Sequence, residues 1–411
     1  MTDAQQIEKT HSIGYIESID GIRGLFMLSV LLVHLHLANF KIPAFLAQFS
    51  LHLFFVLSAF LISSILYKQK ERATSFKAFA KDFYIKRALR ILPLYWAYIL
   101  FFIGFAIILR LVAPTIENTF LGVVYDIKHF GWMLLTFTFN YREVYAWSQD
   151  LSHLRCHVFP HLWSISIEEQ FYLIIPTVIY FLSKKSIRNI SIIVILIYPF
   201  IRIFGFQYLR DVVQMKATFG EESNVLFNFF YRSSLFQFDA FFYGLLIPLV
   251  NINNKKILYA LYVFFIALLL GNQIYSSYIF SIQNKLSFLD SIANTMVLYK
   301  NGQYTVVNTL YNLVSFCLVY IAVYFPNSFF NKLYGVDFLK KIGKIVYGFY
   351  VYHAVFALLT LALYYGFLIK WIPNILADFI AIIFCITTTY YFAKFSYYKF
   401  EMRFLKLKPK I

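Results

Sequence analysis

The sequence predicts an all-α protein that crosses a membrane about ten times, with both ends of the chain in the cytoplasm. The first observation is composition, because 60% of the 411 residues are hydrophobic and only 14% are charged. Such a chain is too apolar for a soluble domain. The second observation is length, because the apolar segments have the roughly 17 to 25 residues that a spanning helix needs. The third is charge, because basic residues cluster in alternate connections.

The predicted spans follow one another along the whole chain. In order, they are 22–40, 48–67, 91–112, 166–183, 188–206, 235–251, 257–275, 306–325, 344–368 and 375–396. The basic segments that we place in the cytoplasm are 68–90, 184–188, 255–256, 332–344 and 397–411. The opposite connections are longer and less basic, at 113–165, 207–234 and 276–305. Within the first of these, the short apolar run 129–140 is expected to be re-entrant or interfacial.

A single membrane domain is expected over residues 1–411. The polar N-terminal segment 1–18 lacks the basic region and cleavage site of a signal peptide, so we expect it to stay in the cytoplasm, as does the basic tail 397–411. Cys156, Cys317 and Cys385 are scattered and form no disulfide framework. The net charge of +17 does not indicate a nucleic acid partner, because the basic residues lie in short clusters between apolar spans. The expected partner is the lipid bilayer.

The first span carries an unusual set of polar residues: Asp20, Arg23, His34 and His36. Arg23 and His34 are eleven positions apart, which at about 100° per residue places both on one helix face, about 16 Å apart along the axis. Snorkelling of the arginine and a hydrogen-bonded core histidine would explain them structurally. Alternatively, a buried neutral imidazole can take a proton from a hydroxyl nucleophile or be acylated itself. His36 lies on another face and is not expected to share that role.

Arg87 and Arg90 open the third span at the predicted cytoplasmic surface, next to Lys86. Positive-inside anchoring explains part of this cluster. Two guanidinium groups three residues apart also share a helix face and can hold the phosphates of a cytosolic donor.

The segment 161–176 enters the fourth span from the opposite side. Ser164 is a candidate helix cap, and Glu168 and Glu169 fit the first turn of the helix. Two carboxylates at a membrane mouth, beside His161 and Trp163, also suit a sugar site or a partner for a buried cation.

Further polar residues indicate a polar interior within an apolar bundle. These residues are Ser58, Arg232, Asp239, His353 and Glu401. Arg232 and Asp239 are nearly two helical turns apart, so we expect them to face the same cavity. The run 153–161, which begins at His153, has four residues that bind metals elsewhere, but its spacing matches no metal signature. No metal is expected.

Several stretches, in order, resemble the integral-membrane acyltransferase-3 family of bacterial sugar O-acyltransferases. They are IDGIRGLFMLSVLLVH, FFVLSAFLI, KRALRILPLYW, HLWSISIEEQFYLIIP, FDAFFYGLLIP, YGFYVYH and YYKFEMRF. Two details depart from the family pattern. Ser58 is followed by alanine where the family has glycine, and Glu401 is not followed by the usual proline.

The resemblance implies a multi-pass protein of the bacterial inner membrane. It also implies transfer of an acetyl group from acetyl-CoA to a hydroxyl of a carbohydrate. Typical acceptors are lipid-linked or surface polysaccharides, such as O-antigen in lipopolysaccharide, capsule or peptidoglycan. On this basis His34 is the catalytic histidine and Arg23 its partner. Arg87 and Arg90, with Lys86 and Ser58, are expected to bind the donor.

The mechanism expected from the resemblance has a donor side and an acceptor side. The pantetheine arm would carry the thioester to His34, which acts as a general base or forms an acyl-imidazole. Arg23 would hold the thioester or phosphate region, and Glu168 would orient the acceptor or the histidine. The predicted acceptor residues are Asp20, Trp163, Ser164, Glu169, Arg232, Asp239 and His353. Two alternatives remain: an acyltransferase that acts on a small molecule, and a transporter of a polysaccharide precursor.

Overall fold

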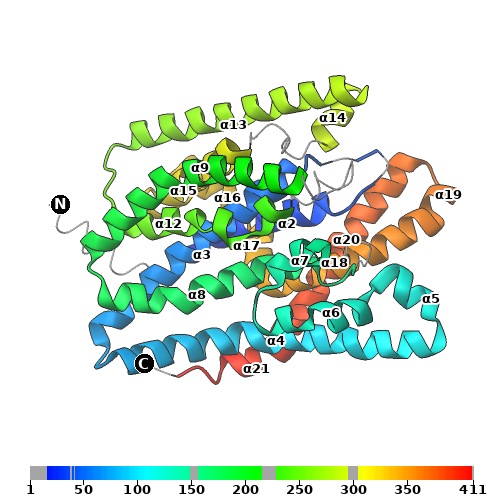
Figure 1. Ribbon diagram of the computed structural model, residues 1–411, viewed down its shortest axis with the longest axis horizontal. Coiled ribbons are helices and arrows are strands. Elements are labelled where there is room, and N and C mark those ends of the chain that lie inside the picture. Colours follow the sequence, from blue (N-terminus) through cyan, green and yellow to red (C-terminus); the bar gives the residue numbers. More distant parts are fainter. Residues whose placement is uncertain are drawn as a thin grey trace. The chain divides into compact units, whose positions relative to one another are not determined.

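The computed structural model describes residues 16–37, 39–40, 42–148, 156–214, 228–294 and 304–409 (Figure 1). Every regular element among them is a helix, which confirms the all-α class. The chain divides into two compact units. The first unit comprises Met1–Phe26, Pro43–Ala80 and Phe171–Lys344, and the second comprises Met27–Ile42, Lys81–Gln170 and Ile345–Ile411. Most of the predicted N-terminal segment 1–18, and His153 of the run 153–161, lie outside the described residues.

Within the described residues, seven helical segments are long and apolar enough to cross a membrane. They are Phe45–Arg72, Phe76–Val112, Lys184–Asp211, Lys255–Asn284, Val306–Tyr324, Val346–Trp371 and Asn374–Leu405. Each contains or closely matches one of the predicted spans. The chain therefore has the helices of a multi-pass membrane protein.

The other three predicted spans are helical but shorter or more polar. Helix α2 (Glu17–Val33) has only 17 residues. Helix α8 (Trp163–Phe181) carries two glutamates and a glutamine in its first half, which lowers its hydropathy. The segment Ser234–Leu249 is apolar but falls below the usual spanning length. The total of about ten spans and the cytoplasmic placement of both termini stay predictions.

Two predicted boundaries were wrong. The first span was expected to reach residue 40, but α2 ends at Val33. The basic connection 68–90 is almost entirely helical, because α3 (Phe45–Arg72) extends into it and α4 (Phe76–Val112) begins well before residue 91. Lysine, arginine and alanine favour helices, so these helices continue beyond the apolar segments that hydropathy detects.

In the first unit, helix α12 (Asp239–Leu246) packs against α3 and α9 (Lys184–Gln214) (Figure 1). Helix α15 (Tyr304–Tyr324) packs against α3, α9 and α13 (Lys255–Asn284). The shorter helices of this unit are α11 (Ser234–Gln237), η4 (Ile247–Leu249), α14 (Phe288–Asn294), α16 (Phe329–Tyr334) and α17 (Asp337–Lys344).

The glycines of the IDGIRG stretch allow α2 to lie directly against the backbone of the segment that contains α16 and α17. A Cβ atom on Gly21 would lie 1.7 Å from the carbonyl oxygen of Tyr334, and one on Gly24 would lie 2.1 Å from that of Leu339. Gly343 approaches the carbonyl oxygen of Asp20 in the same way. These contacts leave no room for any side chain at the glycines.

In the second unit, tyrosine hydroxyls tie α4 to its neighbours. Tyr95 donates to the carbonyl oxygen of Leu134 in α6 (Val123–Leu135), and Tyr347 of α18 (Val346–Leu363) donates to that of Ile91. Helix α18 packs along α20 (Asn374–Ser396). The remaining elements are α5 (Pro114–Ile116), η1 (Glu117–Leu121), η2 (Phe139–Tyr141), α7 (Arg142–Ser148), η3 (Pro160–Leu162), η6 (Tyr364–Leu368), α19 (Ile369–Trp371), η7 (Tyr397–Glu401) and α21 (Met402–Leu405).

The apolar run 129–140 lies partly in α6 and partly in the turn after it. An ion pair of 2.6 Å joins Asp126 of α6 to Arg142 of α7, and both side chains are buried. The guanidinium also lies 4.6 Å from the centre of the Phe130 ring. The pKa of the Asp126 carboxyl is raised by burial, which the charge of Arg142 partly opposes. Helix α6 has 13 residues, which is shorter than a membrane span.

Candidate active site

His34 lies at the carboxyl end of α2, in the turn directly after Val33, and it is exposed. The prediction of a buried imidazole inside the helix that carries Arg23 was therefore wrong, because α2 ends one residue earlier. The Nδ1 atom of His34 is 2.7 Å from the carbonyl oxygen of Val30. A carbonyl oxygen only accepts hydrogen bonds, so Nδ1 carries the proton and the basic lone pair of the neutral ring is on Nε2. The chain then leaves the helix, because the carbonyl oxygen of His36 accepts from Tyr365 and the amide of Asn39 donates to Asp378.

Two more histidines of the second unit continue from this ring: His353 contacts His34, and His161 contacts His353. His353 is on α18, and the centres of the His34 and His353 rings are 5.0 Å apart. His161 is on η3, and its ring centre is 5.2 Å from that of His353. Both pairs meet edge to face, at 79° and 80°. His353, predicted only as an acceptor residue, thus lies between the predicted catalytic histidine and His161, which the sequence placed beside a possible sugar site.

The rings of His161 and His353 each have a fixed orientation. His161 donates from Nε2 to the carbonyl oxygen of Val351 at 3.1 Å. His353 donates from Nδ1 to the carbonyl oxygen of Tyr350. The hydroxyl of Tyr350 in turn donates to the carbonyl oxygen of His161 and accepts from Ser164, whose Oγ is 2.6 Å away. Ser164, predicted as a helix cap and acceptor residue, therefore joins the start of α8 to α18.

A basic group on α4 and the C-terminal tail also belongs to the second unit. It contains Lys86, Arg87 and Arg90, as predicted, and the tail residue Lys408, which was not singled out. Lys86 forms an ion pair with Asp82 at 2.8 Å. The pKa of Lys408 is lowered to about 8, first by burial and then by the positive charges of Arg90, Arg87 and Lys86. The tail amine is therefore near enough to the three α4 cations to feel their charge.

Carboxylates face the same arginines. Glu169 on α8 interacts electrostatically with Arg87, and Glu401 on η7 with Arg90. Glu401 lies against Gly348 of α18, where a Cβ atom would meet its Oε1 at 3.0 Å. The basic group is therefore close to the half-buried Glu169, to the buried Glu401 and to the tail residue Lys408. Glu168, the other predicted carboxylate of α8, is half-buried and also belongs to the second unit.

The remaining predicted residues belong to the first unit, apart from Trp163, which is buried at the start of α8. Arg23 forms an ion pair of 3.8 Å with Asp20, one turn earlier on α2. Ser58 shares a hydrogen bond of 2.6 Å with Tyr172. Arg232 lies between α9 and α11 along the chain and is half-buried.

Asp239 is part of a fully buried polar network in the first unit. Its carboxylate forms an ion pair with Arg202 and accepts from the Asn312 amide at 2.9 Å. Asn312 also bonds to Nδ1 of His52 at 2.8 Å. Arg202 was not among the predicted site residues, although an arginine inside a predicted membrane span indicates a buried charge with a partner.

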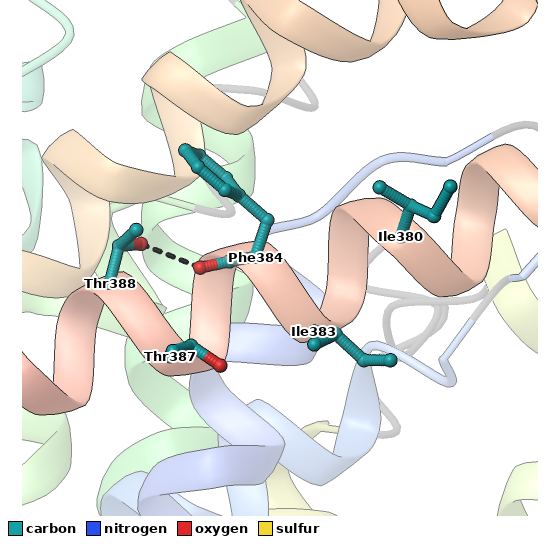
Figure 2. A pocket seen from close by; sticks show the side chains of 5 residues that line it. All are labelled: Ile380, Ile383, Phe384, Thr387 and Thr388. Carbon is teal, nitrogen blue, oxygen red and sulfur yellow. Dashed lines mark hydrogen bonds between the residues drawn. The ribbon is translucent and has the colours of Figure 1, made fainter.

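A shallow groove on α20 is lined by none of the histidines or charged residues described above. Figure 2 shows that it is lined by Ile380, Ile383, Phe384, Thr387 and Thr388. The Thr388 hydroxyl donates to the carbonyl oxygen of Phe384 at 2.7 Å, so this polar atom is satisfied within the helix. The surface is typical of a lipid-facing helix, and it contains no group that can act as an acid or base.

Comparisons with known proteins place the chain in a family. The family model described as an acyltransferase domain matches residues 16–394. The O-acetyltransferase OatA of Staphylococcus aureus is 29% identical over 191 residues, which is 46% of this chain and 29% of that protein. The peptidoglycan O-acetyltransferase OatA of Listeria monocytogenes is 30% identical over 168 residues, which is 40% of this chain and 24% of that protein.

The matched part thus covers less than a third of the length of these relatives. No solved structure matches the chain. The family model, however, spans nearly all of the described residues, including His34, Arg87, Arg90, His161 and His353. The chain belongs to the acyltransferase-3 family, as its motifs predicted.

Proposed function

We propose that the chain is a membrane O-acetyltransferase that moves an acetyl group from cytosolic acetyl-CoA to a hydroxyl group of a cell-surface carbohydrate. The observation that carries this proposal is the state of His34. Its Nδ1 proton is held by a backbone carbonyl, so the basic atom of the ring is Nε2. Membership of an acyltransferase family and similarity to proteins named O-acetyltransferases support the reaction class.

In the proposed reaction, Nε2 of His34 takes the proton of the acceptor hydroxyl. The hydroxyl oxygen attacks the thioester carbonyl carbon, the carbon–sulfur bond breaks, and the thiolate recovers the proton from His34. The bond from Nδ1 to Val30 stabilises the imidazolium that forms between these steps. An acyl-imidazole on Nε2, which the hydroxyl then attacks, fits the same ring orientation.

The basic group of Lys86, Arg87, Arg90 and Lys408 is the proposed site for the phosphates of CoA. Guanidinium groups bind phosphate in a bidentate manner, and clustered cations raise the local concentration of an anionic donor. If the chain lies in the membrane as the positive-inside distribution predicts, this group faces the cytosol, where acetyl-CoA is made available. Arg23 and Ser58 are proposed to assist on the donor side, and Glu168 to orient the acceptor or His34.

The acceptor class is a glycan of the bacterial envelope, and the membrane is the cytoplasmic, or inner, membrane. Lipopolysaccharide O-antigen and other lipid-linked glycans are the acceptors that the sequence resemblance favours. Peptidoglycan is another acceptor that the resemblance implies, and the name of the Listeria relative supports it. An acyltransferase for a small molecule is the second candidate. Nothing among the described residues favours a transporter over these two.

The proposal is tested by mass spectrometry of envelope glycans from cells with and without the gene. Loss of the mass of one acetyl group from a defined sugar in the deletion strain, restored by the intact gene but not by His34→Asn, is the expected result. Unchanged glycans together with acetylation of a small molecule would support the second candidate instead.

A further inference from the structure

Two buried nitrogen lone pairs next to His34 have no hydrogen-bond partner. The side chain of His353 is completely buried, and that of His161 is only 7% exposed. Nε2 of His353 and Nδ1 of His161 are the two orphan atoms. A buried polar atom without a partner is unfavourable and calls for an explanation in a native structure.

The other nitrogen of each ring determines what these atoms can bind. His353 donates from Nδ1 to Tyr350, and His161 donates from Nε2 to Val351, in both cases to a carbonyl oxygen. Each ring is therefore protonated at the nitrogen that faces the backbone. In the neutral ring, the orphan nitrogen is an acceptor. Neutral rings are favoured here because burial disfavours a charged imidazolium.

Two neutral acceptors select a ligand that donates hydrogen bonds. Phosphate and carboxylate groups are excluded because they are acceptors themselves. A metal ion is not indicated, because the part of the chain that the structure describes contains no group of three His, Cys, Asp or Glu side chains with metal-binding geometry. Hydroxyl groups are neutral donors, and a sugar carries several of them at fixed spacing.

We propose that His353 and His161 form a hydroxyl-binding subsite for the carbohydrate acceptor. This inference rests on the proposed function and adds the means by which the acceptor is held. The contact between the His353 and His34 rings places the subsite beside the proposed base. One sugar hydroxyl would bind to the subsite while its neighbour is presented to His34.

The surrounding bonds give the subsite a rigid frame. Tyr350 makes two of these hydrogen bonds. Its backbone carbonyl oxygen accepts from His353, and its side-chain hydroxyl donates to the carbonyl oxygen of His161. Ser164 donates to the same tyrosine hydroxyl. The two rings are thus held by one connected set of bonds, as a preorganised binding site requires.

Asparagine and glutamine separate the two roles of each ring. Asparagine places its amide near the position of Nδ1, and glutamine places its amide near that of Nε2. His353→Asn and His161→Gln therefore keep the bond to the backbone and remove the proposed acceptor. His353→Gln and His161→Asn do the opposite and serve as matched controls. The measurement is alkali-labile, ester-bound acetate in the cell envelope at equal membrane abundance of the full-length protein.

The variants that remove the acceptor, His353→Asn and His161→Gln, are expected to lower ester-bound acetate by about fivefold to tenfold, as loss of one hydrogen bond to a substrate predicts. The Michaelis constant for acetyl-CoA, measured in membrane vesicles, is expected to stay within about twofold of the wild-type value. The controls are expected to retain more acetate than their partners at the same position. Each position gives its own comparison, so the loss of one variant from the membrane leaves the other usable.

The opposite order, with greater loss in the controls, would assign the two histidines a structural role and overturn the proposal. Equal acetate in both members of each pair, or absence of all four variants from the membrane, would overturn it too. Acetate that resists alkali would indicate an amine acceptor instead of a hydroxyl. If the wild-type protein adds no acetate at all, the proposed function itself fails, and this result is distinct from any pattern among the variants.

Discussion

Nδ1 of His34 donates a hydrogen bond of 2.7 Å to the carbonyl oxygen of Val30, one turn earlier on α2. The backbone amide of His34 also donates to this carbonyl oxygen, at 3.3 Å, so the side chain adds a second bond at the end of the helix. The side-chain bond fixes the ring, so that Nε2 is the basic atom. The same contact therefore determines which nitrogen of His34 can act as the proposed base.

His34→Asn is expected to reduce acetyl transfer by a factor of about 10² to 10⁴, the usual contribution of a general base. Asparagine retains a donor near the position of Nδ1, so the bond to Val30 and the fold are preserved. Acetyl transfer in membrane vesicles at matched protein abundance is the measurement. His36→Asn is the control, because the His36 side chain is exposed and its contact with Tyr365 uses the backbone carbonyl. Activity of His34→Asn within tenfold of the control would rule out the proposed base.

Arg87→Gln and Arg90→Gln are each expected to raise the dissociation constant for acetyl-CoA by about tenfold, because a charge-assisted hydrogen bond to phosphate is lost. The effect should shrink as salt is added, since exposed charges are screened. Lys81→Gln is the matched control, because it removes one positive charge from an exposed position of the same helix. The dissociation constants of the three variants are compared by titration calorimetry with the purified proteins. Equal weakening in all three variants would indicate only a general electrostatic effect.

Donor affinity is expected to fall as the pH rises through about 8, because the pKa of Lys408 is lowered to about 8 by burial and by Arg90, Arg87 and Lys86. Below this pH the amine is protonated and attracts phosphate, and above it the charge is lost. Bound phosphate would raise the pKa, so binding is strongest on the acid side. Lys408→Gln should weaken binding at pH 7 and remove this step from the pH profile. A step that persists in Lys408→Gln would assign it to another group.

The same linkage gives a stability effect of opposite sign. In the unfolded chain Lys408 has an ordinary, higher pKa, so the folded state without donor loses a proton first as the pH rises. The protonated Lys408 amine therefore lowers the free energy of unfolding below about pH 8, and this destabilisation is lost as the pH rises above that value. Such a conflict between stability and binding is typical of functional charges.

Hydropathy and charge located the spanning helices well, because the length of a membrane span is set by the bilayer and is visible in a local stretch of sequence. Helix ends were less predictable. The segment 68–90 looked like a connection because it is charged, yet α3 and α4 extend into it because those charged residues favour helices. The segment that follows α2 donates a hydrogen bond to Asp378 and accepts one from Tyr365, and both of these residues are far along the chain.

The site was predictable where one residue is anomalous in its own surroundings. His34 is a histidine in an apolar stretch, and Arg87 with Arg90 forms a local pair on one helix. Lys408 was predicted only as part of the basic tail, and His161 only as a neighbour of a possible sugar site. Their contacts are with residues that are distant in sequence: the α4 cations for Lys408 and His353 for His161. Only tertiary structure shows those contacts.

The buried ion pair of Arg202 and Asp239 is expected to be structural. Both side chains are almost completely enclosed, and Asn312 and Thr309 complete their hydrogen bonds. Asp239→Asn should destabilise the protein by about 3 to 5 kcal/mol, because the arginine is left buried with an uncompensated charge. A thermal unfolding scan of the purified protein measures the change.

The double variant Arg202→Met with Asp239→Leu distinguishes structure from substrate binding. Replacing both charges by apolar groups should recover most of the lost stability, because neither charge is then left alone. If the pair is structural, acetyl transfer should recover with stability. Recovery of stability without any activity would favour the prediction that Asp239 contacts the acceptor.

Gly24→Ala is expected to destabilise the first unit by about 1 to 3 kcal/mol, because the new methyl group would lie 2.1 Å from the carbonyl oxygen of Leu339. Backbone atoms on both sides of this contact cannot move aside as a side chain would. Gly104→Ala on α4 is the matched control, since a Cβ atom there meets nothing within 4 Å. In a helix interior that control should be neutral or slightly stabilising. A melting temperature of Gly24→Ala equal to that of Gly104→Ala would refute the close packing of α2, and with it the structural reason for the paired glycines that flank Arg23.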